Sequence, residues 1–217
     1  SSDLAFHNLR NGRPGPVIIE IPADVATQEV PESALNYHPP KRSPQSPAAG
    51  DIKDAVRLLL NANKPVIWSG MGVLLSDATQ ELKELAELTG IPVYSTMPGK
   101  SSFDDRHPLS LGAGSSATSL PARTWLQESD VLFAVGSSMT RTSYGQPIPD
   151  GKVIIHNTES IEDLNKDFSV DVSIPGDAKL TLQAMIDEVK AQVGDNGRKD
   201  YSRVTDEIAQ LKSRWMA

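Results

Sequence analysis

The chain has 217 residues, of which 38% are hydrophobic and 23% charged, which is typical of a soluble chain with one sizeable core and additional end segments. Its formal net charge of -7 provides no positive surplus to neutralise phosphates, so a nucleic-acid partner is not expected. The lack of cysteine excludes disulfides, thiolate catalysis and cysteine zinc sites, and it is compatible with a cytoplasmic location. No apolar run approaches the roughly 20 residues of a membrane span, so we expect no membrane contact.

The first 50 residues predict separate pieces of structure. Residues 3–10 carry Leu4, Phe6 and Leu9 among polar residues and predict a short helix. The β-branched run at 16–22 predicts a strand, which either joins a later sheet or pairs with segments outside the chain, because a lone strand cannot satisfy its own backbone. The proline-rich residues 26–50 predict an extended linker, since proline removes backbone donors.

Apolar patterns alternate regularly after residue 50. Strands are expected at 66–68, 92–96, 130–135, 152–156 and 170–174, and helices at 51–60, 76–89, 120–127 and 177–193. A long polar loop is expected at 97–116. Each return to a parallel strand needs a crossover, so the pattern predicts an α/β fold: a doubly wound, Rossmann-like parallel sheet of about five or six strands with helices on both faces. A last helix at 201–215 has an apolar stripe that must dock on the protein body or on another chain.

The segment KPVIWSGMG at 64–72 is an apolar run followed by Gly70 and Gly72. It predicts a strand that turns into a helix. Such a turn at the carboxyl end of a strand lets a ligand approach the backbone, and the following helix presents N–H groups to an anion. The alternative is a tight turn without a ligand.

A crevice is expected where the strands that end at Gly70 and Gly136 lie side by side. The residues predicted to line it are Gly70, Met71, Gly72, Thr96, Lys100, Ser137 and Arg141. Arg141 suits a phosphate or a carboxylate, although a surface ion pair is an alternative, and Lys100 is the second candidate. We expect His156 to be satisfied by a backbone hydrogen bond rather than to bind a metal.

Five stretches resemble thiamine-diphosphate-dependent enzymes of the acetolactate synthase type. They are GRPGPVIIEIPADV at 12–25, KPVIWSGMG at 64–72, ELAELTGIPVYSTMPGKSSF at 84–103, HPLSLG at 107–112 and SVDVSIPGDAKLTL at 169–182. The resemblance implies that residues 1–25 are the tail of a pyrimidine-binding domain and 26–50 a linker. Residues 51–194 would be the central domain, and 195–217 a helix leading to a diphosphate-binding domain.

The resemblance also implies that thiamine diphosphate and magnesium bind outside this chain. The family holds magnesium and diphosphate with a GDG motif and a downstream NN, and this sequence lacks that pair. Gly176-Asp177-Ala178 is better explained as a turn and an N-cap before a helix. We therefore assign no catalytic residue and no metal ligand.

The resemblance allows FAD or ADP in the central domain, but the sequence departs from the family pattern there. Arg141 has no adjacent acid, Thr158 and Ser160 stand at acidic places, and Ile161 stands at a proline. We expect weak binding or none for FAD and modest binding at best for ADP. The resemblance implies a full-length lyase or transferase that decarboxylates 2-oxo acids and joins carbon to carbon, with the remaining domains and further copies as partners. This chain alone would be inactive; the alternative is a stand-alone nucleotide-binding or sensing module.

Overall fold

A computed structural model describes residues 2–197 and 200–217. The chain divides into two compact units, one that ends at Pro44 and one from Gln45 to Ala217. The first unit contains α1 (Ser2–Arg10), α2 (Ala23–Ala26) and the 3-10 helix η1 (Glu32–Leu35). Within it, the backbone N–H of Ser43 donates to the side-chain oxygen of Asn11 at 2.6 Å.

The strand predicted at 16–22 does not join the later sheet, so that alternative is wrong, whereas pairing with segments outside the chain stays a prediction. The described residues of the first unit form no strand, and the sheet of the second unit contains no strand from this segment. Ile18 is 88% exposed. The run has β-branched residues, but a strand also needs a hydrogen-bonded neighbour, which this segment does not have.

The second unit is built on a six-stranded sheet in which every pair is parallel. Its strands are β1 (Val66–Ser69), β2 (Val93–Thr96), β3 (Ser110–Gly114), β4 (Val131–Val135), β5 (Val153–Thr158) and β6 (Val172–Pro175). Their order is β3-β2-β1-β4-β5-β6, so the sheet is wound outwards in both directions from β1 and β4. The predicted doubly wound α/β fold is confirmed.

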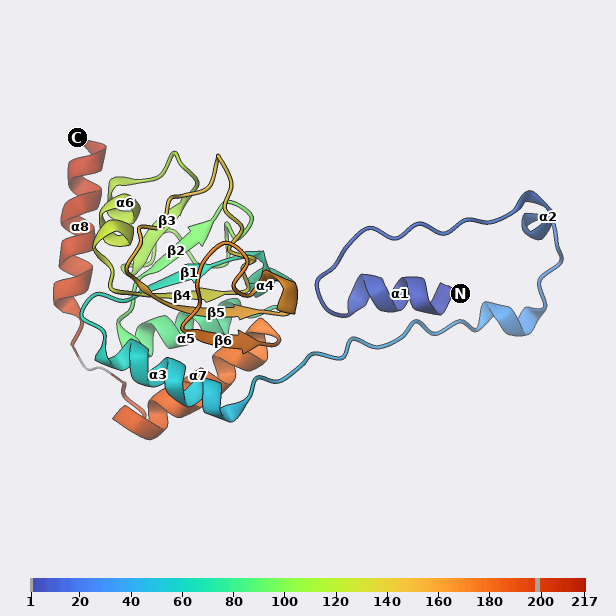
Figure 1. Ribbon diagram of the computed structural model, residues 1–217, viewed down its shortest axis with the longest axis horizontal. Coiled ribbons are helices and arrows are strands. Elements are labelled where there is room, and N and C mark those ends of the chain that lie inside the picture. The colour runs from blue at the N-terminus through green and yellow to red at the C-terminus, as the bar shows by residue number, and fades with distance from the viewer. Residues whose placement is uncertain (1, 198–199) are drawn as a thin grey trace. The chain divides into compact units, whose positions relative to one another are not determined.

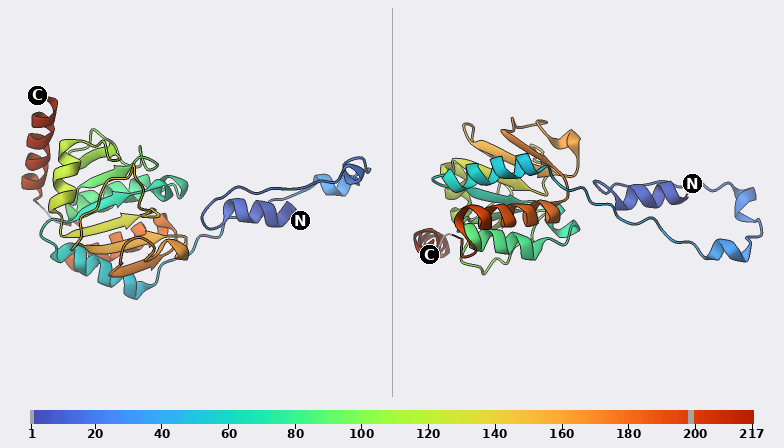
Figure 2. Two further views of the ribbon diagram at one scale, coloured as in Figure 1. Left: turned by 45° about the horizontal axis from the view of Figure 1, so that its top comes forward. Right: turned by 90° about the horizontal axis from the view of Figure 1, so that it is seen from below.

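Helices cover both faces of this sheet (Figures 1 and 2). They are α3 (Ala49–Asn61), α4 (Met71–Leu75), α5 (Thr79–Thr89), α6 (Leu120–Glu128), α7 (Ala178–Val193) and α8 (Ser202–Met216), with a 3-10 turn η2 (Ile161–Asp163). Helices α3, α5 and α7 pack on one face, and α6 and α8 on the other. Asp177 caps α7 by accepting a hydrogen bond from the N–H of Leu180 at 3.0 Å, which confirms the predicted N-cap.

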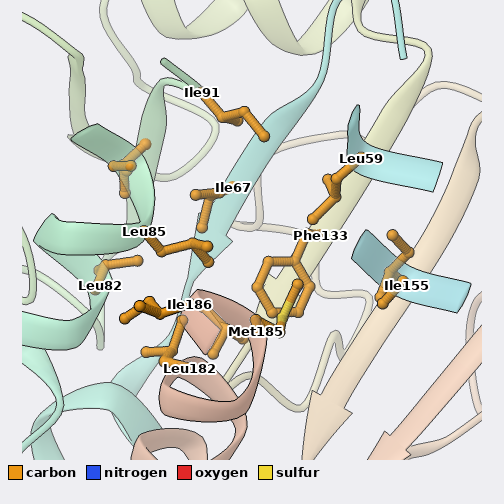
Figure 3. Packing of buried hydrophobic residues seen from close by; sticks show 14 of the residues in the cluster. Leu59, Ile67, Leu82, Leu85, Ile91, Phe133, Ile155, Leu182, Met185 and Ile186 are labelled. Atoms are coloured by element: carbon orange, nitrogen blue, oxygen red, sulfur yellow. The ribbon is translucent and has the colours of Figure 1, made fainter. Parts of the chain in front are cut away.

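Alternate side chains of β1, β2, β4 and β5 supply two separate cores. In β1, Ile67 packs with α3, α5 and α7, whereas Val66 and Trp68 face α6. Figure 3 shows the first core, where Phe133 of β4 and Ile155 of β5 lie against side chains of the helices. Both faces of the central strands are buried, which explains why these strands appear in the sequence as continuous apolar runs.

Two expected boundaries are wrong. The polar loop expected at 97–116 contains the edge strand β3, whose glycines and serines hide it in the sequence although its backbone pairs with β2. Ser76 was expected to open a helix, but it ends α4, and α5 begins at Thr79. The N–H of Ser76 donates to the carbonyl of Gly72 at 2.9 Å, and this bond closes the short helix.

The apolar stripe of α8 was expected to dock on the protein body or on another chain. Ile208 and Leu211 dock on the protein body, whereas the end of the helix does not. Ile208 and Leu211 are buried on the side of α6, whereas Trp215 remains 56% exposed at the end of the helix. No helix within the described ranges has both the length and the apolar character needed to cross a membrane.

We predict that Ile155→Val lowers the free energy of unfolding by about 0.5–1.5 kcal/mol, because it removes one methylene group from a filled core. The matched control is Ile161→Val, at a position that is 72% exposed, where the change should stay within about 0.5 kcal/mol. Urea unfolding followed by circular dichroism measures both. Equal effects at the two positions would mean that the core around Ile155 is loosely packed.

Candidate functional site

The crevice is predicted at the point where the winding of the sheet reverses, and the structure places the carboxyl ends of β1 and β4 side by side there. The backbone of the turn after β1 is bound directly to that of the turn after β4. The N–H of Gly70 donates to the carbonyl of Val135 at 2.9 Å, and the N–H of Gly72 donates to that of Gly136 at 2.7 Å. In open α/β sheets this position is the usual place for a ligand.

Glycine is required here because the two turns touch backbone to backbone. A Cβ atom on Gly70 would overlap the carbonyl oxygen of Gly136, and one on Gly72 would lie 2.6 Å from the Cα of Gly136. Gly136 also has a φ of +58°, in the left-handed region that favours glycine. The glycines thus hold two turns together, and the N–H groups of Gly70 and Gly72 are already bonded. These two N–H groups are therefore not free to bind a phosphate.

The loop after β2 lies beside the glycine turn. The hydroxyl of Thr96 donates to the carbonyl of Ser69 at 3.2 Å and accepts from the N–H of Gly99 at 3.1 Å. Lys100 is exposed, and its ammonium lies 3.5 Å from the carboxylate of Asp105. The structure therefore brings Thr96 to the end of β1 and places the charge of Lys100 against an acid of its own loop.

The loop after β4 is fixed through Ser137. Its hydroxyl oxygen accepts from the indole Nε1 of Trp68 at 3.3 Å and from the N–H of Met139 at 3.2 Å. Its carbonyl accepts from Nε2 of the buried His156 at 2.7 Å. The expected backbone hydrogen bond of His156 is confirmed, and it requires the proton to be on Nε2.

Burial lowers the pKa of His156, while the hydrogen bond to Ser137 and the charge of Asp163 act in the opposite direction. The net effect is a neutral imidazole over a wider pH range than in an unfolded chain. A neutral side chain fits its position between β5 and the loop of Ser137.

Arg141 lies against the loop that follows β5. Its backbone N–H donates to the carboxylate of Asp167 at 2.8 Å, and its guanidinium lies 4.8 Å from the ring centre of Phe168. A long contact of 3.4 Å joins Nη2 to the carbonyl of Asp167. Within the described part of the chain, the guanidinium has no carboxylate partner, so the surface ion pair considered as an alternative is not formed. Its charge is available to an anion.

Sequence reasoning missed Asn157, which connects four segments at this edge of the sheet. Its side-chain oxygen accepts from the N–H of Gly136 at 3.2 Å. Its amide nitrogen contacts the carbonyls of Ile174 and Gly176 and the hydroxyl of Thr181 at 2.9–3.0 Å. An asparagine at the end of an apolar run carries no local signal for such a role, because all its partners are distant in sequence.

An acid also lies beside the positions where the sequence departs from the family pattern. The hydroxyl of Thr158 contacts the carboxylate of Asp163 at 3.4 Å, and Asp163 is buried in η2. Across the described ranges, His, Asp and Glu form no group of three or more that could hold a metal ion.

The sequence of the central domain matches the model of a known protein family. The model of the family "Thiamine pyrophosphate enzyme, central domain" matches residues 52–185, which include β1 to β6. The chain belongs to this family.

Members and structures similar to this central domain belong to longer proteins. This chain is 36% identical over 221 aligned positions to the acetolactate synthase large subunit of Corynebacterium glutamicum. The alignment covers 97% of this chain and 34% of that protein. It is 32% identical over 197 positions to glyoxylate carboligase of Escherichia coli O157:H7, covering 89% of this chain and 33% of that protein. The chain thus spans about a third of the length of these relatives.

A solved structure supports the fold of the central domain. Benzoylformate decarboxylase from Polynucleobacter necessarius superposes with a TM-score of 0.63 at 22% identity. The match covers 79% of this chain and 32% of that chain. At this identity the likeness shows the common fold.

We predict that His156 makes the central domain less stable in acid. In the unfolded chain its pKa is about 6.5, whereas burial lowers its pKa in the folded chain, so the unfolded state binds more protons once the pH falls below that value. This contribution is complete above about pH 6.5 and is lost as the pH falls towards the folded pKa, at up to about 1.4 kcal/mol per pH unit.

The measurement is urea unfolding at about pH 7.5 and about pH 5 for the wild type and His156→Gln. Glutamine keeps a donor for Ser137 but does not titrate. Its loss of stability in acid should be smaller than that of the wild type. Identical losses would show that His156 does not resist protonation in the fold.

Proposed function

We propose that this chain is the central domain of a thiamine-diphosphate-dependent enzyme of the acetolactate synthase type. In the longer protein, the reaction would decarboxylate a 2-oxo acid and form a new carbon–carbon bond. The observation that carries the proposal is the family match over residues 52–185 together with 36% identity to an acetolactate synthase large subunit over 97% of the chain.

The cofactor supplies the chemistry in this proposal, because thiamine diphosphate stabilises the negative charge that develops when CO₂ is lost. Magnesium and the diphosphate would be held outside this chain, because the sequence lacks the GDG motif and the downstream NN by which the family holds them. The role of this chain is to connect and position the neighbouring domains. We propose the remaining domains of the polypeptide and further copies of it as partners, and a cytoplasmic location, with which the lack of cysteine is compatible.

We predict no CO₂ release from pyruvate by this chain alone when thiamine diphosphate and magnesium are added. The full-length polypeptide of the same gene should release CO₂ and form acetolactate under the same conditions, with glyoxylate and benzoylformate as competing substrates. Turnover by the chain alone, above a blank without protein, would overturn the division of roles. A full-length protein that prefers glyoxylate or benzoylformate would keep the cofactor class and change the substrate.

The crevice carries a second candidate function, nucleotide binding. We propose that an ADP-like group, if bound, lies beside Gly70, Met71, Gly72, Thr96 and Ser137, with Arg141 as the first phosphate contact and Lys100 as the second. The available guanidinium of Arg141 favours this, whereas the bonded N–H groups of the glycine turn limit affinity. FAD should bind weakly or not at all.

Calorimetric titration of ADP and FAD into the purified chain tests this candidate. Arg141→Ala should weaken ADP binding about tenfold or more, the value of a charge-assisted hydrogen bond. The exposed Arg123 of α6 provides the control, since Arg123→Ala should leave affinity unchanged. Tight stoichiometric FAD binding would show that this domain does not need the missing acids to bind FAD. ADP binding that is insensitive to Arg141→Ala would place the pocket elsewhere.

A further inference from the structure

Lys64, two residues before β1, lies between two helices that carry acids. Its ammonium donates to the carboxylate of Glu128 on α6 at 2.6 Å and to that of Glu207 on α8 at 2.5 Å. The same ammonium lies 4.3 Å from the ring centre of Trp125 on α6. One cation therefore neutralises acids on both helices and covers an aromatic ring.

The surroundings fix Lys64 in this position. Its backbone N–H donates to the carboxylate of Asp130 at 2.9 Å, and the N–H of Asn63 donates to the other carboxylate oxygen at 2.7 Å. The indole N–H of Trp125 donates to the carbonyl of Pro65 at 3.1 Å, so the ring is also held in place. Partial burial disfavours the charge of Lys64, but the hydrogen bonds to both glutamates raise its pKa overall, and the ammonium stays charged.

Apart from Lys64, helix α8 is attached on the side of α6 by a small apolar contact, in which Ile208 is buried and Val204 is partly buried. Of its 15 residues, only Ile208 and Leu211 are buried, and its last turn carries Trp215 and Met216 in exposed positions. A helix with so little apolar burial is sensitive to the charges at its contact surface. Without Lys64, the carboxylates of Glu128 and Glu207 would face each other unneutralised.

We propose that Lys64 is an electrostatic latch for α8: its charge keeps α8 docked on α6, and its loss releases α8 while the rest of the central domain stays folded. The latch belongs to the fold of this chain and does not depend on the proposed enzymatic function. Higher ionic strength or neutralisation of Lys64 would therefore weaken the docking of α8 on α6.

Hydrogen exchange measured by mass spectrometry on the full chain tests the latch. In Lys64→Met, which keeps the aliphatic stem over Trp125, amides of α8 should exchange about tenfold faster at low salt, while those of α7 do not change. The double variant Lys64→Met/Glu207→Gln should return to within about threefold of the wild type, because the repulsion between the two acids is removed. Loss of packing alone would not be rescued.

The matched control is Lys190→Met, because Lys190 also bridges two helices: its ammonium lies 2.6 Å from Glu84, joining α7 to α5. This variant should leave α8 exchange unchanged. In the wild type, raising salt from about 0.02 M to about 0.5 M should speed α8 exchange, because it screens the ion pairs of Lys64. In Lys64→Met the same rise should slow α8 exchange, because it screens the repulsion between Glu128 and Glu207. The latch is overturned if Lys64→Met exchanges like the control, if α7 accelerates equally, or if the double variant is not rescued.

Discussion

The contact between the turn after β1 and the turn after β4 is the constraint on which the rest of the structure depends. The N–H groups of Gly70 and Gly72 donate to the carbonyls of Val135 and Gly136. A Cβ atom on either glycine would collide with the backbone of Gly136. This contact sets the spacing of the two central strands at their carboxyl ends. It also uses the N–H groups of Gly70 and Gly72, and backbone donors that hold the fold together are not available to a ligand.

Side chains from distant segments then fix the loops around this contact. Asn157 joins the Gly136 turn to β6 and α7, and His156 holds the carbonyl of Ser137. The loop that carries Arg141 is thus held by buried polar groups, and Arg141 itself is held by Asp167 and Phe168. A cation in a fixed loop at the edge of a parallel sheet is suited to an anion.

The family of the chain and the activity of its relatives rest on different observations. Membership follows from a match to most of the second unit, and the superposition at a TM-score of 0.63 shows the same fold. The names of the relatives, such as acetolactate synthase, describe proteins about three times as long as this chain. The described residues form a sheet with a core on each face. The turns after β1 and β4 touch through their glycines, and α8 packs on the side of α6.

The sequence by itself determined the alternation of helices and buried strands, because parallel strands covered on both faces appear as continuous apolar runs such as 130–135. It also predicted the adjacency of Gly70 and Gly136 and the cap at Asp177, which follow from strand order and local turn chemistry. Only the tertiary structure revealed β3, whose small residues have no pattern of their own, and left 16–22 without a partner. It alone brought Asp167 to Arg141, Thr181 to Asn157 and Glu207 to Lys64, since such contacts join segments that no local pattern relates.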